Sequence, residues 1–372
     1  MRIGMNLLYL IPGHVGGTQT YAESLIRALA GIDERNQYTL FVNPEAARLD
    51  WPQKPNFHIV VCRLAARRRA ARYAYEQLVL PRLLKQLNID LVHSPGYVSP
   101  LKTHCASVVS ILDVVHVAYP MSRAKRLALG FFVTQSARRC DHIITISRFS
   151  QQKIREHLGV AAEKTTVTPL GFRESPPLAP TDFASLSTRY NIEKPYIVAF
   201  SGLPVHKNMP RLIQAFARLA AEIDHQLVLI GNLPPGSDVR GEIARHGLEK
   251  RVVITGYVPD RDVMPLLQHG DVFVFPSWYE GFGLPVLDAQ RAGLPIACSR
   301  AASLPEVAGD AAQYFDPFSV QEMTESIRRC AQDDSLRARL RERGQENARR
   351  FSWKNTARAT LEVYHEVVKR RE

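Results

Sequence analysis

Short, continuously apolar segments recur along this chain, and they constrain its fold more than any other feature. Most are rich in valine and isoleucine, as in Tyr196–Phe200 and Val272–Phe275. Strands that are apolar on both faces must be covered by helices on both faces, as in parallel sheets. Segments with helical spacing of apolar residues separate them, for example Leu212, Phe216 and Leu219. This alternation predicts an α/β protein with Rossmann-like parallel sheets.

The predicted strands form two sets, one in each half of the chain. In the first half we expect strands at Ile3–Tyr9, Tyr38–Val42, His58–Cys62, Leu91–His93, Ser107–Leu112 and His142–Ile146. In the second half we expect strands at Tyr196–Phe200, Gln226–Ile230, Arg251–Thr255, Val272–Phe275, Pro295–Cys298 and Gln313–Phe315. The two sets predict two sheets.

A chain of 372 residues is long enough for two domains, at roughly 100–200 residues each. The stretch 173–189 contains prolines, lacks apolar periodicity and is the predicted linker. We therefore expect an N-terminal domain at 1–172 and a C-terminal domain at 190–350. The last segment, 351–372, is predicted to be a helix and is a candidate to pack back on the first half.

Cysteine spacing and hydropathy indicate the class of protein. Five cysteines are scattered along the sequence, with no CxxC pair, at Cys62, Cys105, Cys140, Cys298 and Cys330. This pattern predicts buried free thiols and argues against a disulfide framework or a structural zinc site. No apolar run reaches the roughly 18 residues of a spanning helix, and the apolar start is interpreted as a strand rather than a signal peptide.

The chain is basic, with 48 Lys and Arg against 36 Asp and Glu and a net charge of +12. This excess favours anionic partners, but no groove-reading helix, zinc spacing or RNA-binding motif supports nucleic acid, which we do not expect. Basic residues beside apolar ones form a candidate membrane-contacting surface; two ordinary helices with solvated basic faces are the alternative. These residues are Arg67, Arg68, Arg69, Arg72, Arg123, Lys125 and Arg126.

Three turns that follow predicted strands are candidate anion-binding sites. Gly16 and Gly17 separate the first strand from a helix, where glycines allow close approach and a helix N-terminus offers N–H groups; a merely tight turn is the alternative. Gly281 and Gly283 lie in a second such turn. Lys207 follows another strand and can reach a phosphate, with a solvated loop as the alternative.

Two acidic residues, Glu280 and Asp288, flank the second turn. Carboxylates accept hydrogen bonds from sugar hydroxyls, although an acid near a helix N-terminus can simply stabilise the helix dipole. Phosphate sites beside carboxylates predict a phosphorylated, hydroxyl-rich ligand. The acidic stretch at 260–262 is interpreted as the solvated start of a helix rather than a metal-binding motif.

With these motifs in place, the sequence resembles the family-4 retaining glycosyltransferases of the GT-B fold. The resemblance extends over nearly the whole chain and is carried by Gly16–Leu29, Leu91–Pro100, Ile146–Ile154, Thr168–Phe172, His206–Phe216, Ile254–Ser299 and Ser303–Pro317. It implies two Rossmann-like domains facing across a cleft, with a nucleotide-sugar donor held mainly by the second half and the acceptor mainly by the first.

The resemblance also implies the roles of individual residues. Catalytic roles fall on Glu280, Lys207, Asp113 and His116. Donor contacts fall on Gly16, Gly17, Gly202, His206, Lys207, Asn208, Tyr257, Val258, Glu280, Gly281, Phe282, Gly283, Leu284 and Asp288.

The sequence departs from the family pattern at three places. Asp288 stands where relatives usually have a glutamate that holds the ribose. No arginine precedes Lys207, and His206 is a partial substitute. Leu112 stands where relatives often have a histidine; His116 either supplies the lost contact or is an ordinary loop histidine.

The function that this resemblance implies is retaining, metal-independent transfer of a hexose from a nucleotide-diphosphate sugar to a glycan or lipid-linked acceptor. GDP-mannose is the favoured donor, although relatives also use UDP- or dTDP-sugars, and no cofactor is expected. A cytoplasmic enzyme, with the inner membrane face as a candidate peripheral site, fits such chemistry. A GT-B epimerase or phosphorylase remains the alternative, ahead of a basic nucleic-acid-binding protein.

Overall fold

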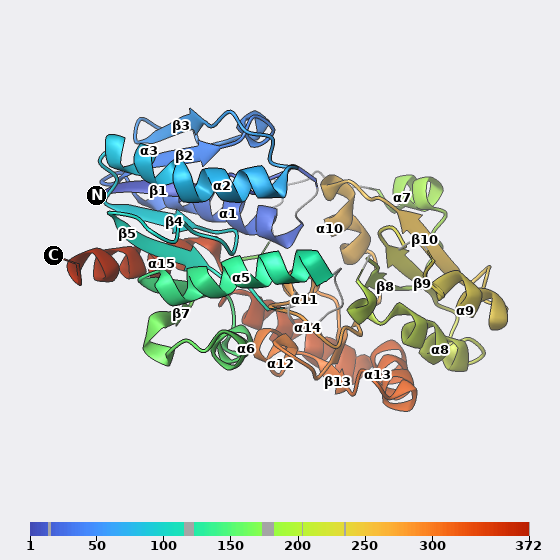
Figure 1. Ribbon diagram of the computed structural model, residues 1–372. Coiled ribbons are helices and arrows are strands. Elements are labelled where there is room, and N and C mark those ends of the chain that lie inside the picture. Colours follow the sequence, from blue (N-terminus) through green and yellow to red (C-terminus); the bar gives the residue numbers. More distant parts are fainter. Residues whose placement is uncertain (14–15, 115–122, 173–181, 203, 234–235, 372) are drawn as a thin grey trace. The chain divides into compact units, whose positions relative to one another are not determined.

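The computed structural model describes residues 1–372 except 14–15, 115–122, 173–181, 203, 234–235 and 372. The chain divides into two compact units. The first comprises Met1–Gly171 and Ser352–Glu372, and the second comprises Phe172–Phe351. Figure 1 colours the chain along its sequence, so that the red C-terminal helix can be followed beside the strands of the first unit.

The first unit is built on a parallel sheet, with seven strands among its described residues, in the order β3-β2-β1-β4-β5-β6-β7. The strands are β1 (Arg2–Asn6), β2 (Gln37–Val42), β3 (Phe57–Val61), β4 (Leu91–Ser94), β5 (Ala106–Ser110), β6 (His142–Thr145) and β7 (Thr165–Val167). In register, Met5 of β1 lies opposite Leu40 of β2 on one side and His93 of β4 on the other. The strand order therefore reverses direction between β1 and β4.

Helices of the first unit cover this sheet. They are α1 (Gly17–Ile32), α2 (Arg69–Leu78), α3 (Leu80–Gln86), α5 (Arg123–Arg139), α6 (Arg148–Leu158) and α15 (Trp353–Lys369). The C-terminal helix α15 packs along α1. Its Tyr364 hydroxyl lies 2.5 Å from His93 Nδ1, and His93 Nε2 lies 2.6 Å from Ser110 Oγ. The last helix therefore completes the first unit, as the sequence suggested.

The second unit has its own parallel sheet, whose described strands follow the order β10-β9-β8-β11-β12-β13. They are β8 (Tyr196–Phe200), β9 (Gln226–Ile230), β10 (Val252–Gly256), β11 (Val272–Phe275), β12 (Ile296–Ser299) and β13 (Gln313–Phe315). The helices are α7 (Phe183–Tyr190), α8 (Met209–Leu219), α9 (Val239–Arg245), α10 (Asp260–Gln268), α11 (Leu284–Arg291), α12 (Leu304–Ala308), α13 (Val320–Gln332) and α14 (Asp334–Ala348). Here the order reverses between β8 and β11.

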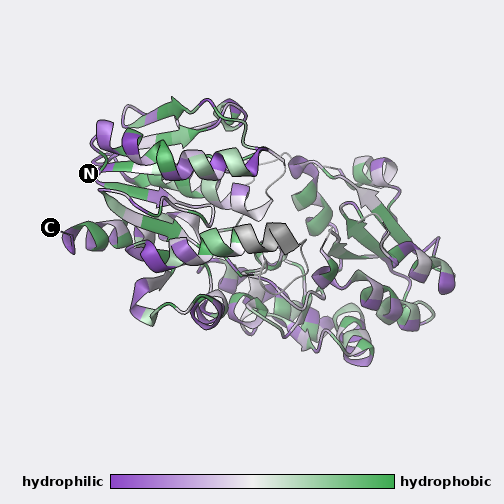
Figure 2. Cartoon of the chain, in the orientation of Figure 1, coloured by the Kyte–Doolittle hydropathy of each residue, from purple (hydrophilic) through white to green (hydrophobic). Residues whose placement is uncertain are grey.

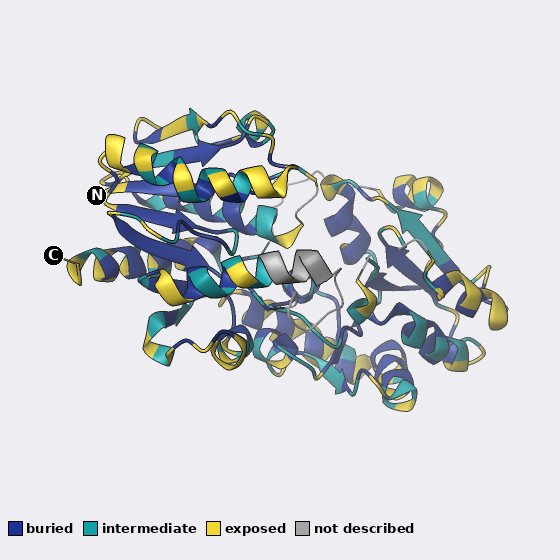
Figure 3. Ribbon diagram, in the orientation of Figure 1, coloured by how far each residue is buried: buried dark blue, intermediate teal, exposed yellow. Residues whose placement is uncertain are grey.

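Burial follows the sequence pattern that predicted parallel sheets. In Figure 2 the strands are mostly hydrophobic, and in Figure 3 the same strands are buried while the outer helix faces are exposed. Leu212, Phe216 and Leu219 of α8 are fully buried and pack with Leu227 and Leu229 of β9 in one core cluster. All five cysteines are buried and free. The two-sheet α/β prediction is therefore confirmed.

The structure corrects the sequence interpretation at three places. The stretch 183–190, placed within the predicted linker, is helix α7, which Asp182 caps by accepting a hydrogen bond from Ala184 N at 3.3 Å. Strand β7 was not predicted because two of its three residues are threonines and form no apolar run. Asp262 is 3% exposed rather than solvated, because Arg189 and Tyr190 both donate hydrogen bonds to its Oδ2 at 2.6 Å.

Candidate functional site

The second sheet brings two predicted loops together. Strands β8 and β11 are parallel neighbours, so the segments that leave their carboxyl ends emerge side by side. Ligands of open α/β sheets bind at such a reversal of strand order, outside the carboxyl ends of the strands. The segment after β8 contains Lys207, and the segment after β11 contains Glu280. These two residues, 73 positions apart, are neighbours because of the topology.

Lys207 and Glu280 form an ion pair with 2.7 Å between Nζ and Oε1. Their side chains are 18% and 14% exposed, so the pair is largely withdrawn from water. Lys207 Nζ also lies 5.1 Å from the ring centroid of Phe275, at the end of β11. A charge-assisted hydrogen bond in such surroundings contributes about 1.5–3 kcal/mol. The structure thus brings together the residue predicted to bind a phosphate and the residue predicted to bind the sugar.

Asn208 fixes the turn that carries Lys207. It has a positive φ of 62° and precedes α8. Its side-chain amide donates to the carbonyl oxygens of Pro276 at 3.0 Å and Pro317 at 2.6 Å. The backbone N–H of Trp278 returns a bond to the carbonyl of His206 at 3.1 Å. Because the Asn208 amide is 2% exposed and committed to these carbonyls, its part in the site is to hold the two segments together.

The glycine-rich turn after Glu280 leads into helix α11. Gly283 has a φ of 110°, and a Cβ there would lie 2.8 Å from Leu304 Cδ2, so a larger residue would be strained. Ser303 Oγ donates to the carbonyl oxygens of Glu280 at 2.9 Å and Phe282 at 2.7 Å. This geometry places the first turn of α11 beside the ion pair, where its backbone N–H groups suit an anion.

The other donor residues predicted in the second unit differ widely in exposure. Tyr257, directly after β10, is 78% exposed, whereas its neighbour Val258 is 8% exposed. Asp288 is 2% exposed on α11. Burial lowers the pKa of His206, with Glu280 opposing and Lys207 reinforcing this shift, so the imidazole is held neutral.

Predicted residues of the first unit lie at the ends of its strands. Gly16, with a φ of 52°, precedes α1, and Gly17 is the first residue of that helix. Asp113 lies after β5 and is half-buried. His116 lies outside the described residues, and its two alternative roles stay predictions.

Two family models match the chain, one in each half. The model described as "Glycosyltransferase Family 4" matches residues 15–176, and the one described as "Glycosyl transferases group 1" matches residues 184–347. Together they leave only the two ends and a short connecting segment unmatched. The chain belongs to the family-4 glycosyltransferases.

Relatives of this family-4 chain include two named mannosyltransferases. It is 34% identical over 227 residues to O-antigen chain mannosyltransferase B of Escherichia coli, covering 60% of each chain. It is 32% identical over 248 residues to an MMP alpha-(1->4)-mannosyltransferase of Mycolicibacterium hassiacum, covering 65% of this chain and 58% of that one. The matched part therefore spans less than two thirds of each relative.

Solved structures agree on the family's fold. The chain superposes on sucrose-phosphate synthase from Thermosynechococcus elongatus with a TM-score of 0.77 over 99% of both chains, at 18% identity. At this identity the likeness concerns the fold, which is the GT-B architecture that the sequence predicted.

The basic surface proposed for this family-4 chain is only partly exposed. Arg67, Arg68 and Arg69 are exposed, but the Arg72 side chain is only 11% exposed because it turns toward Glu76. Arg72 therefore does not belong to a solvated basic face. The remaining three residues, Arg123, Lys125 and Arg126, lie on α5 outside the residues whose side chains are described.

Within the described ranges, no group of three or more His, Cys, Asp or Glu side chains is placed to hold a metal ion. Among the helices in the described part of the chain, none has the length and apolarity to cross a bilayer.

Sequence reasoning missed Ser303, and it assigned Asn208 to a donor contact rather than to holding the two segments together. Ser303 holds the turn between Glu280 and Phe282, and Asn208 joins the segments after β8 and β11. Neither bond is visible as a local pattern, because their partners lie 21 or more positions away. Only the pairing of distant strands brings these partners together.

Proposed function

We propose that this chain is a retaining glycosyltransferase that moves a hexose from a nucleotide-diphosphate sugar to a glycan or lipid-linked acceptor. The observation that carries this proposal is the ion pair of Lys207 and Glu280 at the reversal point of the second sheet. It joins a cation suited to a diphosphate with a carboxylate suited to sugar hydroxyls, beside a glycine-rich turn and a helix N-terminus.

In this proposal the donor separates the two partners of the ion pair. The diphosphate takes Lys207, and the hydroxyls of the donor sugar take Glu280, so each charged group exchanges one partner for another. Without donor, each neutralises the other, which keeps a partly buried charge from standing alone. In this proposal Asp288 contacts the ribose of the donor.

The reaction breaks the bond between the anomeric carbon and the diphosphate oxygen and forms a bond from that carbon to an acceptor oxygen. The acceptor proton passes to the leaving diphosphate, on the face from which the diphosphate departs. Negative charge grows on the leaving group, where Lys207 and backbone N–H groups stabilise it. Glu280 positions the sugar, Asp113 and His116 serve on the acceptor side, and neither a metal ion nor another cofactor is needed.

Mannose is the favoured sugar and GDP-mannose the favoured donor. The printed names of two relatives at 34% and 32% identity, both mannosyltransferases, support this choice. Melting of the full chain with GDP, UDP, dTDP or ADP tests the base, because a ligand that binds only the folded state raises the melting temperature. A shift with GDP larger than with the other three is expected; a larger shift with UDP would replace the proposed donor.

The activity itself is tested with GDP-mannose and a panel of mannose-terminated glycans and lipid-linked sugars. We expect release of GDP that depends on the acceptor, and an NMR spectrum of the product with the anomeric configuration of the donor. Inverted configuration would overturn the retaining mechanism. Epimerisation of the sugar nucleotide without an acceptor would overturn the transferase assignment.

The proposal places the enzyme in the cytoplasm, at the inner face of the membrane where lipid-linked acceptors lie. Arg67, Arg68 and Arg69 are exposed and suit anionic headgroups. Flotation with vesicles containing phosphatidylglycerol should show binding that weakens with salt, and the triple substitution of these arginines by glutamine should reduce it. No binding at low salt would remove the membrane from the proposal.

A further inference from the structure

The first sheet has a reversal of strand order of its own, between β1 and β4. Asn6 is the last residue of β1 and Ser94 the last residue of β4, and the Asn6 amide donates to Ser94 Oγ at 3.2 Å. Both side chains are buried. The general rule for open α/β sheets makes this edge a ligand position of the first unit.

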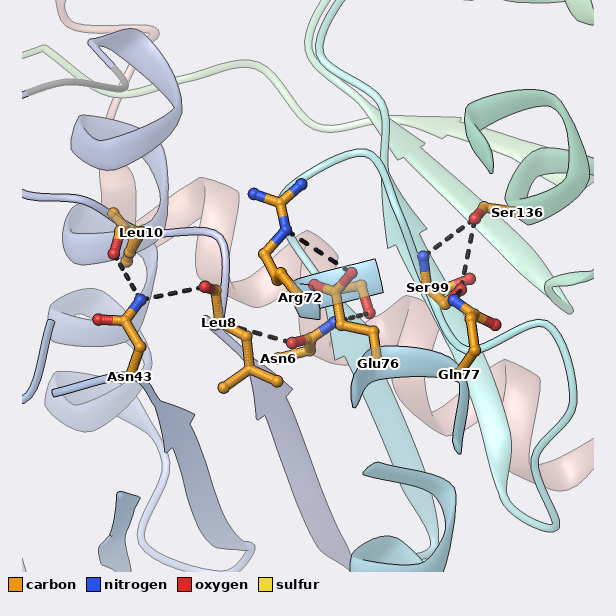
Figure 4. A network of polar contacts seen from close by, with 10 residues as sticks. Asn6, Leu8, Leu10, Asn43, Arg72, Glu76, Gln77, Ser99 and Ser136 are labelled. Atoms are coloured by element: carbon orange, nitrogen blue, oxygen red, sulfur yellow. Dashed lines mark hydrogen bonds and ion pairs between the residues drawn. The ribbon is translucent and has the colours of Figure 1, made fainter. Parts of the chain in front are cut away.

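Helix α2 places a charged pair at this edge. Arg72 and Glu76 are four residues apart and so lie on one face of the helix. Figure 4 shows both side chains beside Asn6, with the two terminal nitrogens of Arg72 directed away from Glu76. The Glu76 side chain is 1% exposed and that of Arg72 is 11% exposed. The carboxylate is therefore enclosed, and the arginine is the more exposed member of the pair.

The pair is incompletely bonded. Arg72 Nε lies 3.9 Å from Glu76 Oε2, which is too long for a hydrogen bond. Among the described residues, neither of these two buried atoms has a hydrogen-bond partner. Burial raises the pKa of Glu76 to about 7, although Arg72 and a hydrogen bond from Asn6 act in the opposite direction. A buried charge that is left in this state costs folding free energy.

A carboxylate with a purely structural role in the same unit is bonded differently. Asp33 accepts hydrogen bonds from the Tyr38 hydroxyl at 2.5 Å, the Asn36 amide at 2.7 Å and the backbone N–H of Arg35 at 3.0 Å. Burial opposes ionisation of Asp33, but these hydrogen bonds outweigh it and lower its pKa. The contrast with Glu76 indicates that the pair on α2 is arranged for something other than stability.

We propose that Arg72 binds a hydroxyl group of a neutral acceptor sugar at the β1 and β4 edge of the first sheet, with Glu76 as the residue that positions its guanidinium. The inference rests on the proposed function, since it names the acceptor side of that reaction. A hydroxyl can both accept from a guanidinium and donate to a carboxylate. Once ionised, Glu76 offsets the charge of Arg72, which favours a neutral ligand over a phosphate. The Tyr73 ring, 4.7 Å from the guanidinium carbon, supports its orientation.

The test measures sugar binding by saturation-transfer NMR on the full chain, with methyl α-mannoside, methyl α-glucoside and methyl α-galactoside as probes. The Glu280→Gln background removes the carboxylate proposed for the donor sugar. We expect at least one probe to bind. Arg72→Gln should raise the Kd of that probe about tenfold, because the variant loses a hydrogen bond from a charged group. Glu76→Gln should raise that Kd less, because the guanidinium remains.

The matched control is Glu156→Gln, which removes the carboxylate of the exposed pair with Lys153 on α6 and should leave probe binding unchanged. With a donor that turns over, Arg72→Gln should raise the acceptor KM about tenfold and leave the donor KM within twofold. If Glu76→Gln fails to fold, probe binding by Arg72→Gln still tests the proposal, because the Arg72 side chain is less buried.

Three results would overturn the inference: no probe binds, binding is equal in Arg72→Gln, or millimolar inorganic phosphate displaces the probe through Arg72 and identifies an anion site. Failure of the proposed function has a separate signature. It would appear as no melting shift with any nucleotide and no cleavage of any sugar nucleotide, neither of which involves the probe glycosides.

Discussion

The two sheets reverse strand order in the same way, but the charged pairs at the two reversal points are built differently. In the second unit, Lys207 and Glu280 come from two loops and close to 2.7 Å. In the first unit, Arg72 and Glu76 come from one helix and stay 3.9 Å apart. In the closed pair each charged group bonds the other, and in the proposed reaction a donor separates them. In the open pair Arg72 Nε and Glu76 Oε2 are too far apart to bond each other, and the proposed sugar contact falls to the terminal nitrogens of Arg72.

In the two proposals the same topological position holds a charged ligand in one sheet and a neutral ligand in the other. A closed lysine–glutamate pair offers a full positive charge when the glutamate bonds another group. An arginine beside an enclosed carboxylate keeps its charge offset and offers directed N–H groups instead. The first arrangement suits a diphosphate, and the second suits hydroxyls.

The largest expected effect is that of Glu280→Ala. Transfer should fall at least about a thousandfold, because the carboxylate orients the reacting sugar, and misplacement of that kind is costly. Affinity for the free nucleotide should stay within about threefold, since most of it comes from the phosphates and base. Steady-state kinetics and calorimetry measure the two quantities. An equal collapse of nucleotide affinity would show that Glu280 only maintains the structure.

Lys207→Ala should have the next largest effect. Loss of a charge-assisted contact with the diphosphate should reduce both donor affinity and turnover, together by about 10–150-fold. Lys207→Ala also removes the side-chain stem, which Lys207→Met largely keeps, so the two variants together separate loss of the charge from loss of packing. A change in kcat/KM below about threefold in both variants would place Lys207 outside the donor site.

Glu76→Gln should change how the unfolding free energy depends on pH. In the folded chain Glu76 has a pKa of about 7, above the ordinary value of 4.5, so the folded state holds its proton to higher pH. Unfolding free energy should therefore fall as pH rises from about 4.5 to 7, by up to the order of 2–3 kcal/mol from this group. The glutamine variant should lack that decrease, and so be relatively more stable at pH 8 than wild type.

Urea unfolding of both chains at pH 5 and pH 8 measures this difference. Among the described residues, two groups face Glu76 and act to lower its pKa. They are the charged Arg72 on the same helix and the Asn6 amide at the end of β1. A variant that gains stability at pH 8 while losing sugar affinity would mark a functional pair. Equal pH dependence of both chains would mean that Glu76 titrates normally.

Ser303→Ala should have the smallest effect. Its hydroxyl holds the carbonyl oxygens of Glu280 and Phe282, so its loss should cost about 1 kcal/mol of stability and lower kcat a few-fold. Thermal unfolding and kinetics check both. An unchanged kcat would show that Gly283 and the packing of Phe282 hold the turn without it.

The sequence by itself determined the α/β class, the two sheets, and the residues that follow β8 and β11. These features depend on local patterns: apolar runs make buried strands, and glycines and charged residues at strand ends make binding turns. Errors occurred where local signals were weak, as in the three-residue β7, or ambiguous, as in α7 within a proline-containing stretch. The prediction that Asp262 is solvated was wrong, because its hydrogen-bond partners lie on α7, more than 70 positions away in the sequence.

Only the tertiary structure decided which charged residues meet and how far they are buried. Arg72 has the same local sequence character as Arg67, yet it lies on α2 beside Glu76 and is only 11% exposed, whereas Arg67 stays exposed. The pairing of Lys207 with Glu280 follows from the adjacency of β8 and β11, which no local spacing encodes. The physical reason is that burial and partnership depend on long-range packing, whereas strand and helix formation depend mainly on neighbouring residues.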